Sequence, residues 1–204
     1  MKDGVYAAEP FGRLAGLDYG AARPFSKWRQ SHLETSIRGW LAFDPPGLEL
    51  ATMAYDELFL RRQELNSGLA FAGADLVPVP WLAEARAAVR ALAETKRKEE
   101  AGEKAGRGKG NVYAILRGGY SADNQWYGVY VGSTAKSIEA RYKEHRSGRR
   151  SARGLPRYGI EPLYSLCDPL NPIFGGKQKR LEWETRLHEA LAPVVPKVTG
   201  DVAF

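Results

Sequence analysis

The chain of 204 residues has a single cysteine, Cys167, and nowhere approaches the run of about 18 uninterrupted apolar residues that a membrane-spanning helix needs. One cysteine excludes an internal disulfide and a zinc site built on several cysteines. No apolar stretch follows Lys2 in the N-terminal residues MKDGVYAAEP, so we expect no secretory signal. These absences predict a cytoplasmic protein in a reducing compartment.

Acidic residues are scarce in the second half of the chain. Residues 1–108 contain 15 Lys or Arg and 15 Asp or Glu, whereas residues 109–204 contain 15 and 9 and carry the whole net charge of +6. Only Glu144 opposes a cluster of seven basic residues: Arg141, Lys143, Arg146, Arg149, Arg150, Arg153 and Arg157. Such an excess is typical of a surface that binds a polyanion, most often nucleic acid. A solvated basic face of a soluble protein would have the same composition.

The first half has the apolar periodicity of helices. Apolar residues recur at helical spacing over Ser31–Leu41, a second helix is expected to end at Asn66–Gly68, and a third helix begins near Trp81. The charged and glycine-rich residues after this third helix predict a flexible linker. We therefore expect a mainly helical N-terminal module at residues 1–105 and a linker at residues 106–110.

After the linker, the pattern changes to short strands. Asn111–Leu116 and Trp126–Val131 are rich in β-forming residues and predict an antiparallel hairpin with a long loop. Three further elements are expected: a helix that Ser137 caps, a strand at Pro162–Cys167 and a helix at Lys177–Ala192. The order β-β-α-β-α predicts a compact α/β domain at residues 111–204, with a three-stranded sheet and flanking helices.

The motifs on these elements resemble those of the GIY-YIG nuclease family. Asn111-Val112-Tyr113 stands at the first motif, with Asn in place of the usual Gly, and Tyr130-Val131-Gly132 stands at the second. Arg141 and His145, four residues apart on the next helix, match the family's Arg and His in kind and spacing. Glu184, in the run Glu-Thr-Arg-Leu, matches its acidic residue. The resemblance covers roughly residues 111–195.

This resemblance implies a divalent-metal-dependent endonuclease that hydrolyses phosphodiester bonds. Tyr113 would be the general base, and Tyr130 would orient the water or the phosphate. Arg141 would hold a phosphate oxygen, and Glu184 would bind Mg²⁺ or Mn²⁺. Because the ordinary pKa of Tyr is about 10, the base role requires nearby positive charge. His145 is expected to hydrogen-bond Tyr113 or the phosphate and to titrate near neutrality, so that activity falls in mild acid.

Contacts to the nucleic-acid backbone are expected from Gly132 and from the basic cluster after Arg141, namely Lys143, Arg146, Arg149, Arg150, Arg153 and Arg157. Lys177, Lys179 and Arg180 are a second candidate group. DNA is expected rather than RNA, and a chain of this length without a recognisable accessory motif favours a restriction, defence or toxin role. Cutting both strands of a duplex with one site per chain favours a homodimer.

Two other interpretations stay open. A nucleic-acid-binding domain that has lost catalysis is favoured by Asn111 and by the absence of the family's Asn from Pro193–Thr199, whereas the presence of all five principal side chains favours the enzyme. Residues 1–105 are either a recognition module or a protein-interaction module for a partner or inhibitor. The loop Arg117–Gln125, an insertion relative to the family, is another candidate for substrate preference.

Overall fold

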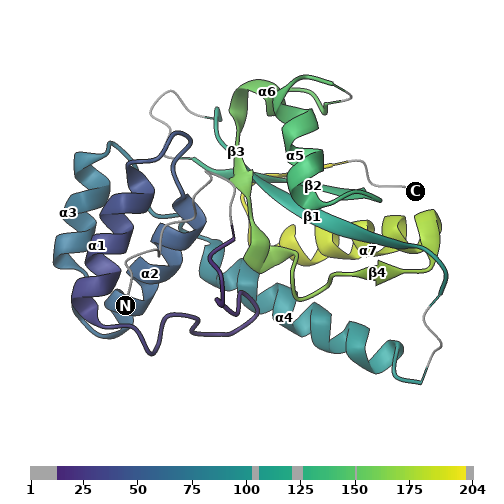
Figure 1. The fold of residues 1–204 in the computed structure, drawn as a ribbon, viewed down its shortest axis with the longest axis horizontal. Coiled ribbons are helices and arrows are strands. Elements are labelled where there is room, and N and C mark those ends of the chain that lie inside the picture. The colour runs from purple at the N-terminus through teal and green to yellow at the C-terminus, as the bar shows by residue number, and fades with distance from the viewer. Residues whose placement is uncertain (1–12, 103–105, 121–125, 150, 201–204) are drawn as a thin grey trace. The chain divides into compact units, whose positions relative to one another are not determined.

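The protein has a mixed α/β fold, as expected. The structure, a computed structural model, describes residues 13–102, 106–120, 126–149 and 151–200. Over these ranges the chain forms seven α-helices, one 3₁₀ helix and a five-stranded mixed sheet (Figure 1). The chain divides into two compact units, Met1–Ala83 and Glu84–Phe204. None of the helices in the described ranges is both long enough and apolar enough to span a membrane.

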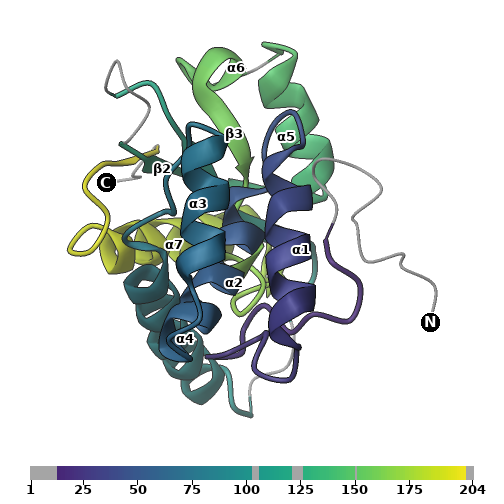
Figure 2. The same ribbon diagram turned by 90° about the vertical axis from the view of Figure 1, so that its left-hand side faces the viewer.

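The N-terminal unit consists of three helices, α1 (Gln30–Leu41), α2 (Leu48–Leu60) and α3 (Leu65–Gly73). Both α2 and α3 pack on α1 (Figure 2). The first expected helix is confirmed, and its apolar stripe is buried in a core formed by Phe25, Leu33, Ile37, Trp40, Leu58 and Phe71. Burial of this stripe, rather than helix propensity alone, stabilises so short a helix.

The expected end of the second helix is wrong. Instead of continuing to Asn66–Gly68, α2 stops at Leu60, and those three residues lie inside α3. Arg62 has a left-handed backbone with φ 59°, and the Gln63 N–H donates to the Leu58 carbonyl over 2.9 Å. This is the hydrogen bonding of a Schellman helix end, in which glycine usually takes the left-handed position. Because Arg takes that position here, no glycine marks the end.

Helix α4 (Leu82–Glu99) confirms the expected helix near Trp81, but it belongs to the C-terminal unit. Arg186 of α7 (Gly176–Leu191) donates to Glu99 over 2.6 Å, and the Lys96 ammonium lies 5.6 Å from the Trp183 ring centre. The boundary between the units therefore lies after Ala83 and differs from the boundary expected at residue 105. Contacts with a helix about ninety residues later, invisible in local composition, account for the difference.

The sheet has the order β3-β1-β2-β5, with β4 also paired to β1. Its strands are β1 (Lys109–Arg117), β2 (Gly128–Thr134), β3 (Gly159–Pro162), β4 (Ile173–Phe174) and β5 (Val198–Thr199). The expected antiparallel hairpin of β1 and β2 is confirmed. The expectation of three strands is wrong, because β4 and β5 have two residues each and are too short for any periodicity to indicate them.

Two further expectations about this sheet are corrected. Lys109 and Gly110, expected in the linker, are strand residues because they pair with β4. The third strand was expected at Pro162–Cys167, but β3 ends at Pro162 and a 3₁₀ helix follows at Tyr164–Leu166. Four apolar residues at helical spacing are buried in this turn: Leu163, Leu166, Cys167 and Leu170. An alternating strand would have exposed part of this set.

Helices α5 (Ile138–Arg146) and α7 cover the two sides of the sheet (Figures 1 and 2), and the short helix α6 (Leu155–Tyr158) precedes β3. The expected N-cap of α5 is confirmed, since the Ser137 hydroxyl accepts the Ala140 N–H over 3.1 Å. Side chains alternate along a strand, so Tyr113 faces the α5 side while its neighbour Val112 faces the α7 side. This alternation distributes the functional residues over both sides of β1 and β2.

Candidate active site

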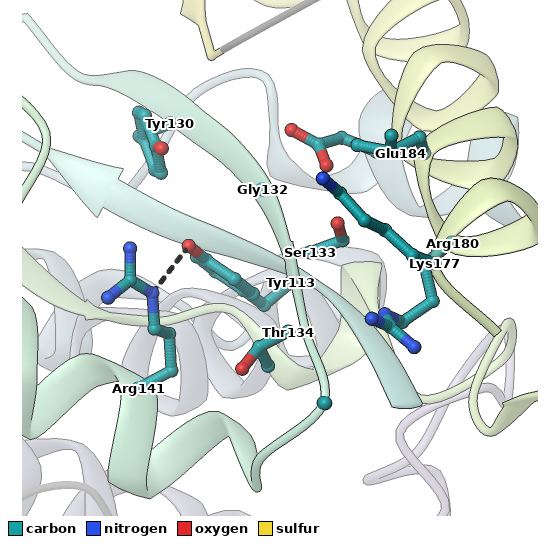
Figure 3. A pocket seen from close by; sticks show the side chains of 11 residues that line it. Tyr113, Tyr130, Gly132, Ser133, Thr134, Arg141, Lys177, Arg180 and Glu184 are labelled. Atoms are coloured by element: carbon teal, nitrogen blue, oxygen red, sulfur yellow. Dashed lines mark hydrogen bonds between the residues drawn. The ribbon is translucent and has the colours of Figure 1, made fainter. Parts of the chain in front are cut away.

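A pocket of about 300 Å³ lies beside the C-terminal half of β2 (Figure 3). It is lined by Tyr113, Tyr130, Gly132, Ser133, Thr134, Ala135, Arg141, Lys177, Arg180, Leu181 and Glu184. Four of the five side chains expected for catalysis are among these residues. The fifth, His145, does not line the pocket but contacts the Tyr113 hydroxyl. The fold thus brings together residues from the hairpin, α5 and α7 that lie up to about seventy positions apart.

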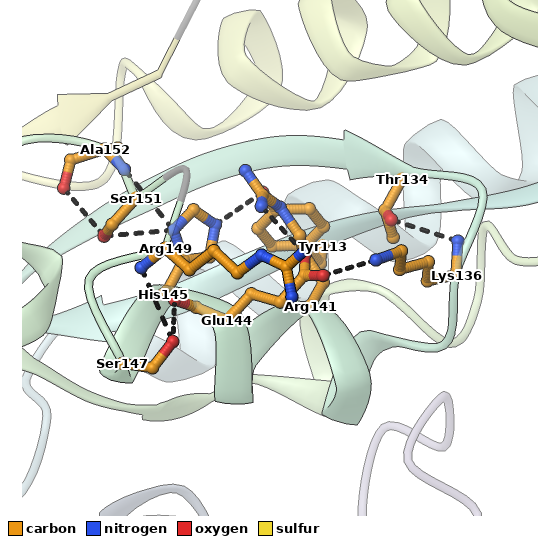
Figure 4. A network of polar contacts seen from close by, with 10 residues as sticks. All are labelled: Tyr113, Thr134, Lys136, Arg141, Glu144, His145, Ser147, Arg149, Ser151 and Ala152. Atoms are coloured by element: carbon orange, nitrogen blue, oxygen red, sulfur yellow. Dashed lines mark hydrogen bonds and ion pairs between the residues drawn. The ribbon is translucent and has the colours of Figure 1, made fainter.

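Tyr113 is the most enclosed polar group of this pocket, with 2% of its surface exposed. Its hydroxyl lies 2.9 Å from His145 Nε2 and accepts a hydrogen bond from Arg141 Nε over 3.3 Å (Figure 4). Gly132 pairs with Tyr113 across the hairpin, and a Cβ at Gly132 would lie 2.5 Å from this hydroxyl. Glycine is therefore needed at position 132, where it leaves room for the phenol at the pocket wall.

The hydrogen bonds of His145 indicate which ring nitrogen carries the proton. The backbone N–H of Ala152 donates to Nδ1 over 3.4 Å, and the Ser151 hydroxyl also lies 3.4 Å from this nitrogen. Because a backbone N–H can only donate, Nδ1 is the acceptor, and Nε2 carries the proton in the neutral ring. Nε2–H then donates to Tyr113, whose oxygen receives one hydrogen bond from His145 and another from Arg141.

These donors support a phenolate, but they do not determine the pKa of Tyr113. Burial raises this pKa, while hydrogen bonds from Arg141 and Tyr130 oppose the shift, and the net direction is upward. The charge of Glu184 also raises the pKa. Without a bound metal ion or substrate, Tyr113 is therefore a neutral phenol at neutral pH.

His145 does not titrate near neutrality, so the expected loss of activity in mild acid on its account is wrong. Burial, together with the nearby charge of Arg141, lowers the pKa of His145 to about 4. The side chain has no exposed surface, and its neutral ring is held between Tyr113 and the loop before α6. His145 is a positioning residue for the phenol across the physiological pH range.

The same pKa shift predicts a pH-dependent stability. A pKa of about 4 in the folded state, below the ordinary value of about 6.5, means that the unfolded chain takes up this proton first as the pH falls. The neutral ring of His145 therefore contributes to the free energy of unfolding. This contribution is complete above about pH 6.5 and falls by about 3 kcal/mol as the pH drops toward 4. We expect denaturant unfolding to show this loss in the wild type and not in His145→Gln, which keeps a donor toward Tyr113. Equal losses in the two proteins would contradict the assignment.

Arg141 is oriented by a second contact beside the pocket. Its Nη1 donates to Glu144 over 3.2 Å, and Glu144 also pairs with Lys136 (Figure 4). The Lys136 backbone is itself fixed, because its N–H donates to Thr134 over 3.0 Å and its carbonyl accepts from Asn111 over 2.8 Å. Asn111 thus holds the turn that leads into α5.

Among the described residues that line the pocket, Glu184 is the only carboxylate, and it is 5% exposed. Nowhere in the described part of the chain do three or more His, Cys, Asp or Glu side chains gather around a common point suited to a metal ion. Mg²⁺ nevertheless binds many proteins through one or two carboxylates, water and substrate phosphate. Glu184 fits that mode of binding.

Of the expected backbone-binding residues that the structure describes, Gly132 lines the pocket and the others lie outside it. Five of the others are exposed on α5, the loop after it and α6: Lys143, Arg146, Arg149, Arg153 and Arg157. Arg150 lies outside the described residues. In the second candidate group, Lys177 and Arg180 line the pocket, whereas Lys179 pairs with Glu182 over 3.3 Å. The spacing of positions 177, 180 and 184 on one helix face could have indicated this.

Asn171 is a positioning residue that the sequence does not reveal. Its side chain accepts the Val112 N–H over 2.9 Å and donates to the Val112 carbonyl over 2.8 Å. These bonds fill the gap along β1 between the part that pairs with β4 and the part that pairs with β3. The backbone next to Tyr113 is thereby fixed on the edge of β1 away from β2, between the residues that pair with β4 and those that pair with β3.

No protein-family model, curated protein or solved structure matches this chain. The GIY-YIG resemblance therefore stays a prediction. Function is therefore inferred from the geometry of the pocket.

Proposed function

We propose that this protein is a divalent-metal-dependent endonuclease that hydrolyses phosphodiester bonds of nucleic acid, with DNA preferred to RNA. One observation carries the proposal: a buried Tyr113 hydroxyl, held by His145 and Arg141, meets a pocket to which Glu184 contributes a carboxylate from another helix. A base, a cation and a hard oxygen ligand around one cavity are the groups that phosphodiester hydrolysis requires.

Each side chain has a defined part in this reaction. The Tyr113 phenolate takes a proton from a water molecule as the water oxygen attacks phosphorus. Arg141 donates to a non-bridging oxygen, where negative charge develops. The bond from phosphorus to the leaving oxygen breaks, and that oxygen keeps the electron pair and takes a proton from solvent. An ion bound by Glu184 would supply positive charge that favours the phenolate and the transition state.

The charge of the pocket supports an anionic substrate. Among the lining residues within the described ranges, three cations, Arg141, Lys177 and Arg180, accompany the single carboxylate of Glu184. A net positive cavity attracts phosphate and stabilises the ionised form of Tyr113. The exposed basic residues of α5 and the following loop would extend this attraction along the backbone. A restriction, defence or toxin role and a homodimer belong to the same proposal.

A second candidate function is nucleic-acid binding without catalysis. The same excess of cations over carboxylates favours it, since binding needs no metal. For the N-terminal unit, a protein-interaction role is supported by Phe59, Leu60, Leu65 and Leu69, which are all more than half exposed.

A cleavage assay separates the two functions. Supercoiled plasmid, single-stranded DNA and RNA are incubated with the protein in Mg²⁺, Mn²⁺ or EDTA, beside Glu184→Ala as a reference. We expect cleavage of DNA with either metal, none in EDTA, and no metal-dependent cleavage by the variant. Absence of cleavage under every condition, with salt-sensitive binding retained, would reject the enzyme and favour the binding function.

A further inference from the structure

The four basic residues of α7 fall into two groups. Lys179 pairs with Glu182 over 3.3 Å, and Arg186 pairs with Glu182 over 2.9 Å and with Glu99 over 2.6 Å. Lys177 and Arg180 line the pocket instead, and neither forms a hydrogen bond or ion pair with any residue of the described ranges. The fold neutralises the two cations outside the pocket and leaves the two that line it for an anion from outside.

Arg180 is also held in place by its surroundings. A Cβ at Gly110 would lie 2.2 Å from Arg180 Cδ and 3.0 Å from its Nε, so the stem of the arginine passes directly over this glycine. Gly110 is fixed in turn by its pairing with Ile173 of β4. A guanidinium confined in this way loses less conformational entropy when it binds a ligand.

These two cations are separated from Arg141. Gly110, under Arg180, is an odd number of residues from Tyr113, so the two residues face opposite sides of β1. Figure 3 accordingly shows Arg141 on one side of Tyr113 and Lys177, Arg180 and Glu184 on the other. A phosphate held by Arg141 therefore lies across Tyr113 from Lys177 and Arg180.

We infer that Lys177 and Arg180 form a second subsite, which binds the phosphate next to the scissile one. The inference rests on the proposed function, because it assigns the scissile phosphate to Arg141. Arg180 presents its paired N–H donors to the phosphate, and Lys177 adds a point charge. The substrate is then a strand with at least two consecutive phosphates, and a dinucleoside monophosphate is a poor substrate.

Binding without catalysis tests the subsite first. A labelled DNA duplex of about 20 base pairs is titrated in EDTA over a range of salt concentrations, where each phosphate contact contributes about 0.9 to the slope of log K against log salt. We expect Lys177→Ala and Arg180→Ala each to lower this slope by about 0.9, and the double variant to lower it by about twice as much. Lys179→Ala, two residues from Lys177 but outside the pocket, is the matched control and should keep the wild-type slope.

Cleavage provides an independent readout. For the wild type, kcat/KM should be about 10- to 100-fold higher for a trinucleoside diphosphate than for a dinucleoside monophosphate, and Arg180→Ala should lose most of this difference. On long DNA the same variant should raise KM more than it lowers kcat. If Arg180→Ala does not fold, Arg180→Gln replaces it in both the binding and the cleavage test, because Gln keeps much of the aliphatic stem over Gly110.

The outcomes distinguish the two proposals. Lower salt slopes in the Lys177 and Arg180 variants, with no cleavage by the wild type, would retain the anion subsite and reject the enzyme. Cleavage by the wild type, with unchanged slopes and an unchanged preference for the second phosphate in both variants, would overturn the subsite alone.

Discussion

Replacement of Tyr113 by Phe is expected to lower kcat for phosphodiester cleavage by about 10²- to 10⁴-fold, the range for loss of a general base. The phenyl ring can keep the packing of Tyr113 against Tyr130 and His145, whose ring centres lie 6.2 and 5.8 Å away. Only the oxygen that accepts from His145 and Arg141 is lost. Single-turnover rates at saturating enzyme measure this effect without a contribution from product release.

Tyr142→Phe is the matched control for this variant. Tyr142 is equally buried, and its hydroxyl donates to the Ile160 carbonyl over 2.5 Å, away from the pocket. Both variants leave a buried polar group without a partner and should lose about 1–3 kcal/mol of stability, so rates are compared at a temperature where both are folded. A kcat of Tyr113→Phe within a few-fold of the wild type would rule out Tyr113 as the base.

The second large effect is expected for Arg141→Ala, with kcat lowered by about 10²- to 10³-fold, as for removal of one donor to a developing oxyanion. Two losses combine in this variant. The phosphate oxygen loses its charged donor, and the Tyr113 oxygen loses the Arg141 Nε–H that stabilises the phenolate. The ascending limb of the pH–rate profile, over which Tyr113 loses its proton, should therefore also move to higher pH, because the pKa of Tyr113 rises further when this donor is removed.

Lys143→Ala provides the control, since Lys143 is an exposed cation on the same helix that does not line the pocket. It should change salt dependence by about one phosphate contact and leave kcat unchanged. Arg141→Lys keeps the charge but not the planar set of donors, so we expect it to recover only a small part of the rate. If Arg141→Ala raised KM and left kcat intact, Arg141 would be a binding residue only.

The sequence was sufficient for whatever depends on neighbours along the chain. Helical spacing located α1, α4, α5 and α7, and alternating β-forming residues located the hairpin. The Ser137 cap and the shared helix face of Arg141 and His145 follow from local geometry in the same way. Tyr113, Tyr130, Arg141 and Glu184 were selected as one group through the resemblance of their motifs to the GIY-YIG family, and the pocket contains all four.

Only the tertiary structure decided what depends on residues far apart in sequence. The strand residues Lys109 and Gly110 and the bonds from Asn171 to Val112 depend on contacts that composition does not encode. The same holds for the pKa of His145, because burial among distant segments, rather than the residue type, lowers it to about 4. Periodicity reports which face of an element is apolar, whereas desolvation and the spatial grouping of charges arise only when the elements pack together.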